Sequence, residues 1–396
     1  MTTTDNLYEW AYLRRVVEAS RTDVLDLLWP EGWEKAGASQ VKAVAEALAR
    51  RGGRLPDELA DATSQRYEQD PSKDIELAAA RGWRLVTPED DEWPEELSAS
   101  FMRMANSGAD HDSSVRGQAA APFALWVRGD IRLDVAVRRS VTVVGTRAAT
   151  RYGEQVTQSF TGDLADAGFS LISGGAVGID ALVHRAALQS KAPTVAVMAC
   201  GLDIPYPKAH TELFEHIIAA GGLVISEYPP GTPPARHRFL TRNRIAAALG
   251  QATLVVEAPL RSGALNTLNW AEAFVKPTFA VPGPVTSHAS LGCLDRIRTS
   301  RATLAVSARD LIEDLSPLGE QMSLGFVEED RSSLLSWEQT AIFDAAGLPS
   351  GRGSEGRLSQ LVEATGLPAR TVIRCLRDLE AMGRLRREAD CWIRVE

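Results

Sequence analysis

The stretch that decides the fold is SVTVVGTRAATRYGEQVTQSFTGDLADAGFSLISGGAVGID, residues 140–180. Two short apolar runs, SVTVV and FSLIS, are each followed by glycine and other small residues, and a segment with helical periodicity separates them. Near-continuous apolar strands joined by helices are typical of a parallel sheet covered on both faces. The stretch is therefore predicted to form a β–α–β unit whose small residues follow the carboxyl ends of the strands.

The same alternation extends along the chain in both directions. Further β-rich runs are ALWVRG (124–129), TVAVMAC (194–200), LVISEY (223–228), ATLVVEA (252–258), TFAVPG (278–283) and TLAV (303–306). Most are separated by 10–20 residues with helical periodicity. This pattern predicts a doubly wound α/β domain that ends near residue 315.

The segments on either side of this domain have other compositions and periodicities. Residues 1–80 are predicted to form short helices, 107–120 an exposed polar loop and 316–335 a linker. The last segment, 336–396, predicts helices at 337–346, 358–365 and 369–382 followed by two short strands. This order is that of a winged helix.

Charge and cysteine content exclude several classes of protein. The 396 residues carry a formal net charge of -9, which argues against a protein coated in positive charge that packs duplex DNA. Residues 1–139 hold 18 basic and 25 acidic residues, whereas 140–315 hold 15 and 14. Four well-separated cysteines without a C-x-x-C pair exclude a disulfide scaffold and a zinc ribbon. Without a signal peptide or an apolar run of about 20 residues, we expect a cytoplasmic protein that does not enter a membrane.

Small and basic residues follow several predicted strands, where ligands of open parallel sheets bind. They are Gly145, Thr146 and Arg147; Ser173, Gly174 and Gly175; Lys208; Arg242, Asn243 and Arg244; and Ser262 and Gly263. Taken together, they predict a groove for phosphates, although each alone is also compatible with an ordinary strand-to-helix turn.

The sharpest local charge feature lies between Glu227 and Glu257. This segment contains no acidic residue, but it contains Arg236, Arg238, Arg242 and Arg244. The arginines belong either to an anion-binding groove or to a solvated helix face, and a solvated face usually mixes both signs.

Two further side chains near the second glycine-rich loop suggest structural roles. Asp180 is predicted to cap the helix that follows. His184 is expected to be packed or at the surface rather than a ligand. The sequence shows no phosphate-binding G-x-x-x-x-G-K-[ST], H-E-x-x-H or G-x-S-x-G motif, so it predicts no catalytic residue and no metal ligand.

The ordered series GTRAATRYG, SGGAVGID, GLDIPYP, ISEYPPGTPPARHRF, TRNRIAAAL, VVEA…RSG and AVPGPVTS…SLG resembles the DprA/Smf family of DNA-processing proteins over residues 83–315. The resemblance implies an extended Rossmann domain over 81–315, an N-terminal small helical (SAM-like) domain over 1–80 and a C-terminal winged helix over 336–396.

The resemblance also implies a function. Members of the family bind single-stranded DNA, help to load RecA during recombination or natural transformation, form homodimers and have no established catalytic activity or cofactor. The small and basic residues named above would form the phosphate pocket. This chain departs from the family pattern at Val177, where arginine is common, at Thr146, where serine is common, and at IRTSRA (297–302).

Three alternatives stay open at this point. Related Rossmann proteins cleave nucleoside monophosphates through P-G-G-x-G-T-x-x-E, but RSGALNTLNWAE has one glycine and a displaced Glu272. The terminal helix carries Arg370, Arg374 and Arg377, yet 336–396 holds nine basic and nine acidic residues, so duplex DNA and a protein are equally good partners. Tyr206, Tyr228 and Phe239 are candidates either for base stacking or for the core.

Overall fold

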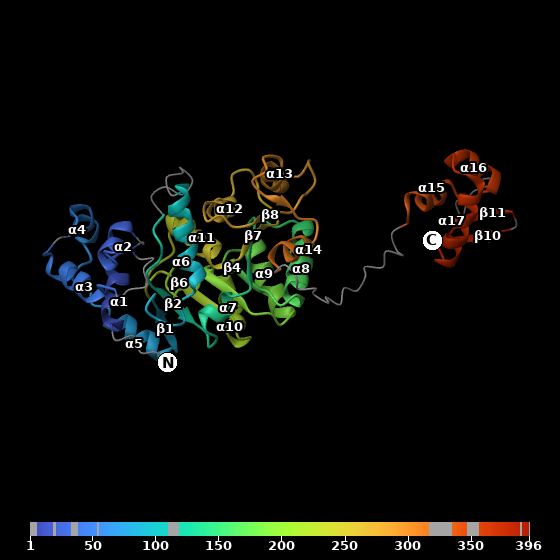
Figure 1. Ribbon diagram of the computed structural model, residues 1–396. Coiled ribbons are helices and arrows are strands. Elements are labelled where there is room, and N and C mark those ends of the chain that lie inside the picture. Colours follow the sequence, from blue (N-terminus) through green and yellow to red (C-terminus); the bar gives the residue numbers. More distant parts are fainter. Residues whose placement is uncertain are drawn as a thin grey trace. The chain divides into compact units, whose positions relative to one another are not determined.

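The computed structural model describes residues 6–18, 21–32, 39–53, 55–109, 119–316, 335–346, 356–388 and 390–395. The chain divides into two compact units, Met1–Leu318 and Gly319–Glu396 (Figure 1). Most of the loop predicted at 107–120 and most of the linker predicted at 316–335 lie outside the described residues. In the described part of the chain, no helix has both the length and the hydrophobicity needed to cross a bilayer.

The first unit is built on a nine-stranded sheet in the order β1-β2-β6-β5-β4-β3-β7-β8-β9. The strands are β1 (Trp83–Val86), β2 (Leu125–Arg128), β3 (Ser140–Val144), β4 (Ser170–Gly174), β5 (Thr194–Met198), β6 (Leu223–Ser226), β7 (Ala252–Val255), β8 (Thr278–Ala280) and β9 (Thr303–Leu304). All neighbours from β6 to β9 are parallel. The predicted doubly wound α/β fold is confirmed.

The two strands at one edge depart from the predicted parallel arrangement. Strand β2 runs antiparallel to β6, with Trp126 opposite Ser226, and β1 runs antiparallel to β2. The only helix between β2 and β3 is α7 (Leu133–Val137), whose five residues are too short for a parallel crossover. The β-rich run at 124–129 is therefore a strand, but its predicted direction was wrong.

Helices cover both faces of the sheet. Their bounds are α6 (Glu95–Ser107), α8 (Arg151–Asp166), α9 (Ile179–Gln189), α10 (Thr211–Ala219), α11 (Arg236–Leu249), α12 (Gly263–Ala273), α13 (Leu291–Arg298) and α14 (Ala308–Leu315), with short 3₁₀ turns η2 (Lys208–His210) and η3 (His288–Ser290). Right-handed crossovers place α8, α9 and α10 on one face, and α11 and α12 on the other. The winding direction reverses between β3 and β7, which makes their carboxyl ends the switch point where such sheets bind ligands.

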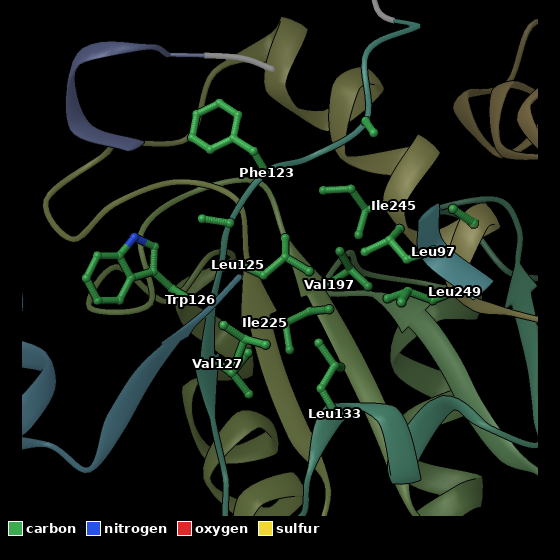
Figure 2. Close-up of a cluster of buried hydrophobic side chains, with 14 of the residues drawn as sticks. Leu97, Phe123, Leu125, Trp126, Val127, Leu133, Val197, Ile225, Ile245 and Leu249 are labelled. Atoms are coloured by element: carbon green, nitrogen blue, oxygen red, sulfur yellow. The ribbon is translucent and has the colours of Figure 1, made fainter. Parts of the chain in front are cut away.

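The core of this unit explains why its strands have continuous apolar sequences. Leu125, Val197 and Ile225 on three strands are fully buried, as are Ile245 and Leu249 on α11 (Figure 2). Each such side chain contributes about 1.5–3 kcal/mol by leaving water. Because both sheet faces are covered, inward and outward positions are alike apolar, and the alternation of a half-exposed strand is absent.

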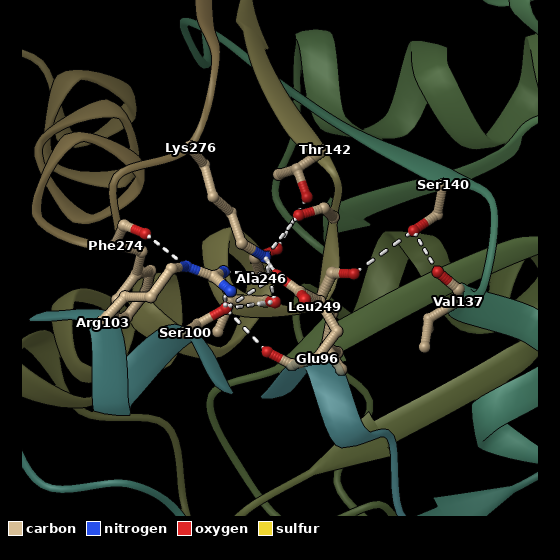
Figure 3. Close-up of polar contacts among 12 residues, drawn as sticks. Glu96, Ser100, Arg103, Val137, Ser140, Thr142, Ala246, Leu249, Phe274 and Lys276 are labelled. Atoms are coloured by element: carbon tan, nitrogen blue, oxygen red, sulfur yellow. Dashed lines mark hydrogen bonds and ion pairs between the residues drawn. The ribbon is translucent and has the colours of Figure 1, made fainter. Parts of the chain in front are cut away.

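Polar side chains hold the carboxyl end of α11 (Figure 3). Thr142 Oγ1 donates to the carbonyl of Ala246 at 2.6 Å, and Lys276 Nζ donates to the carbonyls of Ala248 and Gly250. Lys276 Nζ also lies 3.0 Å from a carboxylate oxygen of Glu96 on α6, and burial lowers the pKa of this lysine to about 8. The last carbonyls of α11 are thereby satisfied, and the helix is fixed with its amino end at the switch edge.

The described residues ahead of β1 form five helices that belong to the same unit as the sheet. They are α1 (Leu7–Val16), α2 (Thr22–Leu28), α3 (Val41–Arg50), α4 (Asp57–Thr63) and α5 (Ser72–Ala80). The fully buried Trp10 on α1 stacks on Phe123, with ring centroids 6.3 Å apart. The helical segment and the sheet therefore share a core, while the predicted domain boundary near residue 80 stays a prediction.

The second unit contains α15 (Trp337–Ala345), α16 (Leu358–Thr365), α17 (Ala369–Ala381) and a hairpin of β10 (Leu385–Glu388) and β11 (Cys391–Arg394). Its own core includes the fully buried Ile342, Leu361, Val372 and Leu379. The helices lie where the sequence predicts them, and Arg357 makes an isolated bridge to Cys391 ahead of α16. This is the element order expected for a winged helix, whose role stays a prediction.

Candidate functional site

Five loops follow the carboxyl ends of the neighbouring parallel strands β6, β5, β4, β3 and β7. Backbone hydrogen bonds join loops that lie far apart in the sequence: Thr146 N to Glu257 O at 2.7 Å, Ile179 N to Thr146 O at 3.1 Å, and Gly201 N to Thr232 O at 2.9 Å. The loops after β3, β4 and β7 thus form one surface, and those after β5 and β6 form another beside it. The sequence prediction that these loops gather at one edge agrees with this arrangement.

Close packing between the first two loops requires glycine at two positions. A Cβ on Gly145 would lie 2.8 Å from Cβ of Ile179 on α9. Gly178 has a φ of 84°, and a Cβ there would lie 2.7 Å from Cα of Arg147. Both glycines are therefore explained by the contact between the two loops, without a ligand.

An internal carboxylate occupies the amino terminus of α8. Glu257, which follows β7 and is 1% exposed, accepts hydrogen bonds from the backbone N–H of Thr150 at 3.0 Å and from its hydroxyl at 2.7 Å. Thr150 is also the N-cap of α8. Because the protein places its own anion at this helix end, Arg147 is the exposed charged group that the first loop offers to a ligand.

The loop after β4 is held by buried polar contacts. The Ser173 hydroxyl donates to the carbonyl of Val143 at 2.6 Å, so its role is structural. His184 is fully buried, with Nε2 2.8 Å from the carbonyl of Gly174 and Nδ1 2.8 Å from the Thr194 hydroxyl. His210 Nδ1 lies 3.0 Å from the carbonyl of Gly175. His184 is thus a packed residue, as one of the two readings of the sequence expects.

Asp180 does not cap α9, and this prediction was wrong. The N-cap position belongs to Gly178, and Asp180 lies two residues further on, inside the first turn. Its carboxylate is buried together with the guanidinium of Arg242, which also donates to the carbonyl of Val197. Burial raises the pKa of Asp180, and the charge of Arg242 acts in the opposite direction. Arg242 is therefore a buried partner of Asp180, with only 6% of its surface exposed.

The arginines of the acid-free segment find carboxylates from elsewhere in the chain. Arg244 is 1% exposed and lies 2.8 and 2.9 Å from the two carboxylate oxygens of Glu227. Arg238 Nε donates to Glu18 at 3.0 Å. Arg242 is buried and its charge acts on Asp180, whereas Arg236 is exposed and makes no ion pair with another described residue. The uncompensated positive stripe suggested by the sequence does not form, because the fold brings Glu18, Asp180 and Glu227 to it.

Asparagine and serine residues connect the start of α12 to α11. Asn243 Nδ2 donates to the carbonyl of Gly263 and to Asn266 Oδ1, both at 3.2 Å. Ser262 is the N-cap of α12, and its hydroxyl accepts from the N–H of Ala264 at 3.2 Å. The structure thus brings Asn243, Ser262 and Gly263 together at the switch edge, where Ser262 and Gly263 stay accessible to solvent.

The solvent-facing part of the edge combines a cation with two aromatic rings. The guanidinium carbon of Arg147 lies 5.2 Å from the ring centroid of Phe239, and the rings of Phe239 and Tyr206 are 5.5 Å apart. Tyr206 is 40% exposed, Phe239 is half-buried, and Lys208 is exposed two residues beyond Tyr206. We call Arg147, Tyr206 and Phe239 the cation–aromatic cluster. Tyr228, the third aromatic candidate, is 1% exposed and belongs to the core.

The sequence reasoning missed three carboxylates that organise this edge: Glu18, Glu227 and Glu257. Glu227 follows β6 directly and Glu257 lies two residues past the end of β7, and they bound the acid-free segment on both sides. Their position near the strand ends was the available signal. Glu18 gave no signal, because its partners lie 48 and 220 residues away.

Within the described ranges, no three His, Cys, Asp or Glu side chains gather in a way that would hold a metal ion. Glu272, the displaced glutamate of the nucleotide-cleaving alternative, lies at the far end of α12. There it pairs with Arg296 at 3.5 Å and with Arg301 at 3.1 Å. It is therefore a structural ion-pair partner, remote from the loops of the edge.

The burial of His184 predicts acid sensitivity. Burial lowers the pKa of His184 from the usual 6.5 to about 4, so below pH 6.5 the unfolded chain binds a proton at this residue and the folded chain does not. The contribution of the neutral His184 to the free energy of unfolding is thus fully present above pH 6.5 and is lost as the pH falls towards 4. We expect His184 to account for a loss of about 2 kcal/mol between pH 7 and pH 5.

Urea unfolding at both pH values measures this effect as a difference between variants. H184Q should lose less stability on acidification than the parent by about that amount, whereas H216Q, at an exposed histidine, should behave like the parent. Equal acid sensitivity of H184Q and the parent would contradict the assignment.

Comparisons with known proteins agree with this arrangement. A profile of the family described as DNA recombination-mediator protein A matches residues 84–316. The putative DNA processing protein DprA of Mycobacterium tuberculosis is 43% identical over 380 residues, which cover 94% of this chain and 90% of that protein. The X-ray structure of DprA from Streptococcus pneumoniae aligns with a TM-score of 0.60 at 29% identity, covering 80% of this chain and all of that one. The chain therefore belongs to the DprA family of DNA recombination mediators.

Proposed function

We propose that the protein binds single-stranded DNA at the switch edge, without strong sequence preference, and promotes the loading of RecA in recombination or transformation. The observation that carries the proposal is the cation–aromatic cluster, which presents a guanidinium and two rings to solvent beside the exposed Lys208. Membership of a family of DNA recombination mediators supports a role in DNA processing.

The chemistry of the cluster favours a single strand over a duplex. Aromatic side chains stack on bases whose faces are free, and every base has such a face, so this mode of binding tolerates any sequence. Arg147 and Lys208 supply positive charge for the phosphates next to those bases. In a duplex the base faces are already stacked on one another, which leaves only the phosphates for this surface to bind.

Fluorescence anisotropy with labelled single-stranded and duplex oligonucleotides tests the proposal. We expect tighter binding of single strands of any sequence, and weaker binding as salt rises. On a plot of the logarithm of the association constant against the logarithm of the salt concentration, R147A should make the negative slope shallower by about 0.7. This is the value for one lost contact to a phosphate of a single strand. R50A, at an exposed arginine on α3, is the matched control and should keep the slope of the parent. Equal affinity for duplex and single strand would contradict the proposal.

The RecA and homodimer parts of the proposal need separate measurements. RecA filament assembly on strands coated with single-strand binding protein should be faster when the protein is added.

Light scattering after size-exclusion chromatography should give the mass of two chains. The edge strand β9, where Leu304 is 45% exposed, and Val306 just beyond it, which is 68% exposed, offer apolar surface to such a second copy.

A further inference from the structure

The end of helix α1 is attached to the segment that joins β6 to α11. Three residues from this end of the N-terminal region, Arg14, Arg15 and Glu18, each contact residues between Glu227 and Arg238. The contacted segment leads directly into the first turn of α11, which carries Phe239. The N-terminal region therefore contacts the segment that leads into Phe239 of the cation–aromatic cluster.

Two of these contacts fix the beginning of the segment. Arg14, which is fully buried, lies 3.3 Å from the carboxylate of Glu227, which also holds Arg244 of α11. Arg15 lies 2.7 Å from the carboxylate of Asp74 on α5 and donates to the carbonyl of Pro230 at 2.8 Å. Helices α1 and α5 thereby hold the proline-rich part of the segment in place.

Glu18 makes the third contact, at the end of the segment. Its carboxylate accepts from Arg238 Nε at 3.0 Å, lies 3.1 Å from Arg66 Nη1, and lies 3.5 Å from His237 Nε2. Arg238 also stacks on the ring of the buried Tyr228 at 5.3 Å and donates to the carbonyl of Pro233. Only 13% of the Arg238 side chain is exposed, so these partners leave little of it for a phosphate.

The first turn of α11 has no capping side chain of its own, so contacts from other parts of the chain stabilise it. Its N-cap residue is Ala235, whose methyl side chain has no atom that accepts a hydrogen bond from the free N–H groups of the turn. A helix start without a side-chain cap is less stable by about 1 kcal/mol, which favours fraying. Residues 237 and 238 belong to that turn, and Glu18 holds both of them from the N-terminal region.

We propose that Glu18 is a positioning residue for the single-stranded-DNA site. It holds Arg238, and through Arg238 it orders the turn in which the next residue, Phe239, meets Arg147 and Tyr206. The proposal rests on the proposed function for its effect on DNA. Its structural half, the ordering of the turn by Glu18, is independent of DNA.

A double-mutant cycle in the full-length protein tests the route through Arg238. Binding of a labelled oligo(dT) is measured by anisotropy for the parent, E18Q, R238Q and E18Q/R238Q. We expect each single variant to bind about fivefold more weakly, and the double variant no more weakly than either. The salt slope should stay that of the parent, because neither residue contacts a phosphate. E46Q, at an exposed glutamate paired with Arg50 on the same helix, is the control and should bind normally.

Hydrogen exchange separates this proposal from the proposed function. In E18Q, the amides of residues 238–241, which donate to the carbonyls of the first turn of α11 and its N-cap, should exchange faster than in the parent and in E46Q, while a thermal melt shows that the fold persists. Unchanged exchange there overturns the proposal, whether or not the protein binds DNA. So does tighter binding by E18Q with a steeper salt slope, which would mean that Glu18 merely withholds Arg238 from phosphate. A parent protein that does not bind oligo(dT) overturns the proposed function instead.

Discussion

Replacing Phe239 by alanine is expected to weaken binding of single-stranded DNA by roughly 5- to 150-fold, the range that corresponds to the loss of one stacked base. The ring of Phe239 lies 5.2 Å from the guanidinium carbon of Arg147 and 5.5 Å from the ring of Tyr206. Its removal takes away one stacking surface and also the ring on which Arg147 rests. Because stacking does not depend on the base, the loss should be similar for all sequences.

Three variants separate stacking from packing. F239L keeps an apolar side chain at the half-buried position but has no aromatic face, so it should bind nearly as weakly as F239A. Y8A removes an aromatic side chain that is 49% exposed on α1 and should bind like the parent. Anisotropy titrations at one fixed salt concentration measure all of them. If F239L restored the parent's affinity, Phe239 would serve to pack the turn rather than to stack on a base.

Much of the sheet and its ligand edge could be predicted from local sequence. The β-rich runs from 140 to 306 all form strands, because continuous apolar runs between helical segments suit only a covered parallel sheet. Once the strands are parallel, the residues after them share one edge by geometry. Arg147, Lys208 and Ser262 were therefore placed together without any knowledge of their contacts.

The electrostatics of that edge could not be predicted in the same way. Local sequence shows which charges are neighbours along the chain, whereas Arg244 and Arg238 pair with Glu227 and Glu18, which lie 17 and 220 residues away. Arg242 is buried and feels the charge of Asp180, 62 residues away. The antiparallel direction of β2 was missed for a related reason. Strand direction depends on which strand is the neighbour in space, and here the neighbour is β6, almost a hundred residues later.

The burial of Arg242 and Arg244, which local sequence does not reveal, changes the meaning of a double substitution at these two residues. From the sequence, R242A/R244A should weaken DNA binding by removing two phosphate contacts. In the structure both guanidinium groups are buried, so the double variant leaves the carboxylates of Asp180 and Glu227 without their main partners. A loss of binding in that variant would then reflect a damaged fold, and Arg147 is the better position for testing phosphate contact.

Replacing Glu227 by alanine is expected to lower the free energy of unfolding by about 3–5 kcal/mol, the usual effect of removing one partner from a buried ion pair. Glu227 is 1% exposed and faces two cations, Arg14 and Arg244, which are 0% and 1% exposed. Without the carboxylate, both guanidinium groups stay buried next to each other with no opposite charge between them. The variant also cuts the link between α1 and α11.

Urea unfolding of E227A and of a matched surface variant, E215A, measures the cost of this burial. Glu215 pairs with Arg128 but is 55% exposed, so E215A should lose at most about 1 kcal/mol. E227Q keeps an oxygen that accepts a hydrogen bond but removes the charge, and it should fall between the parent and E227A. If E227A and E215A lost the same stability, water would already reach the Glu227 pair. Arg244 would then be free to leave the carboxylate for a phosphate, and the groove suggested by the sequence would have to be reconsidered.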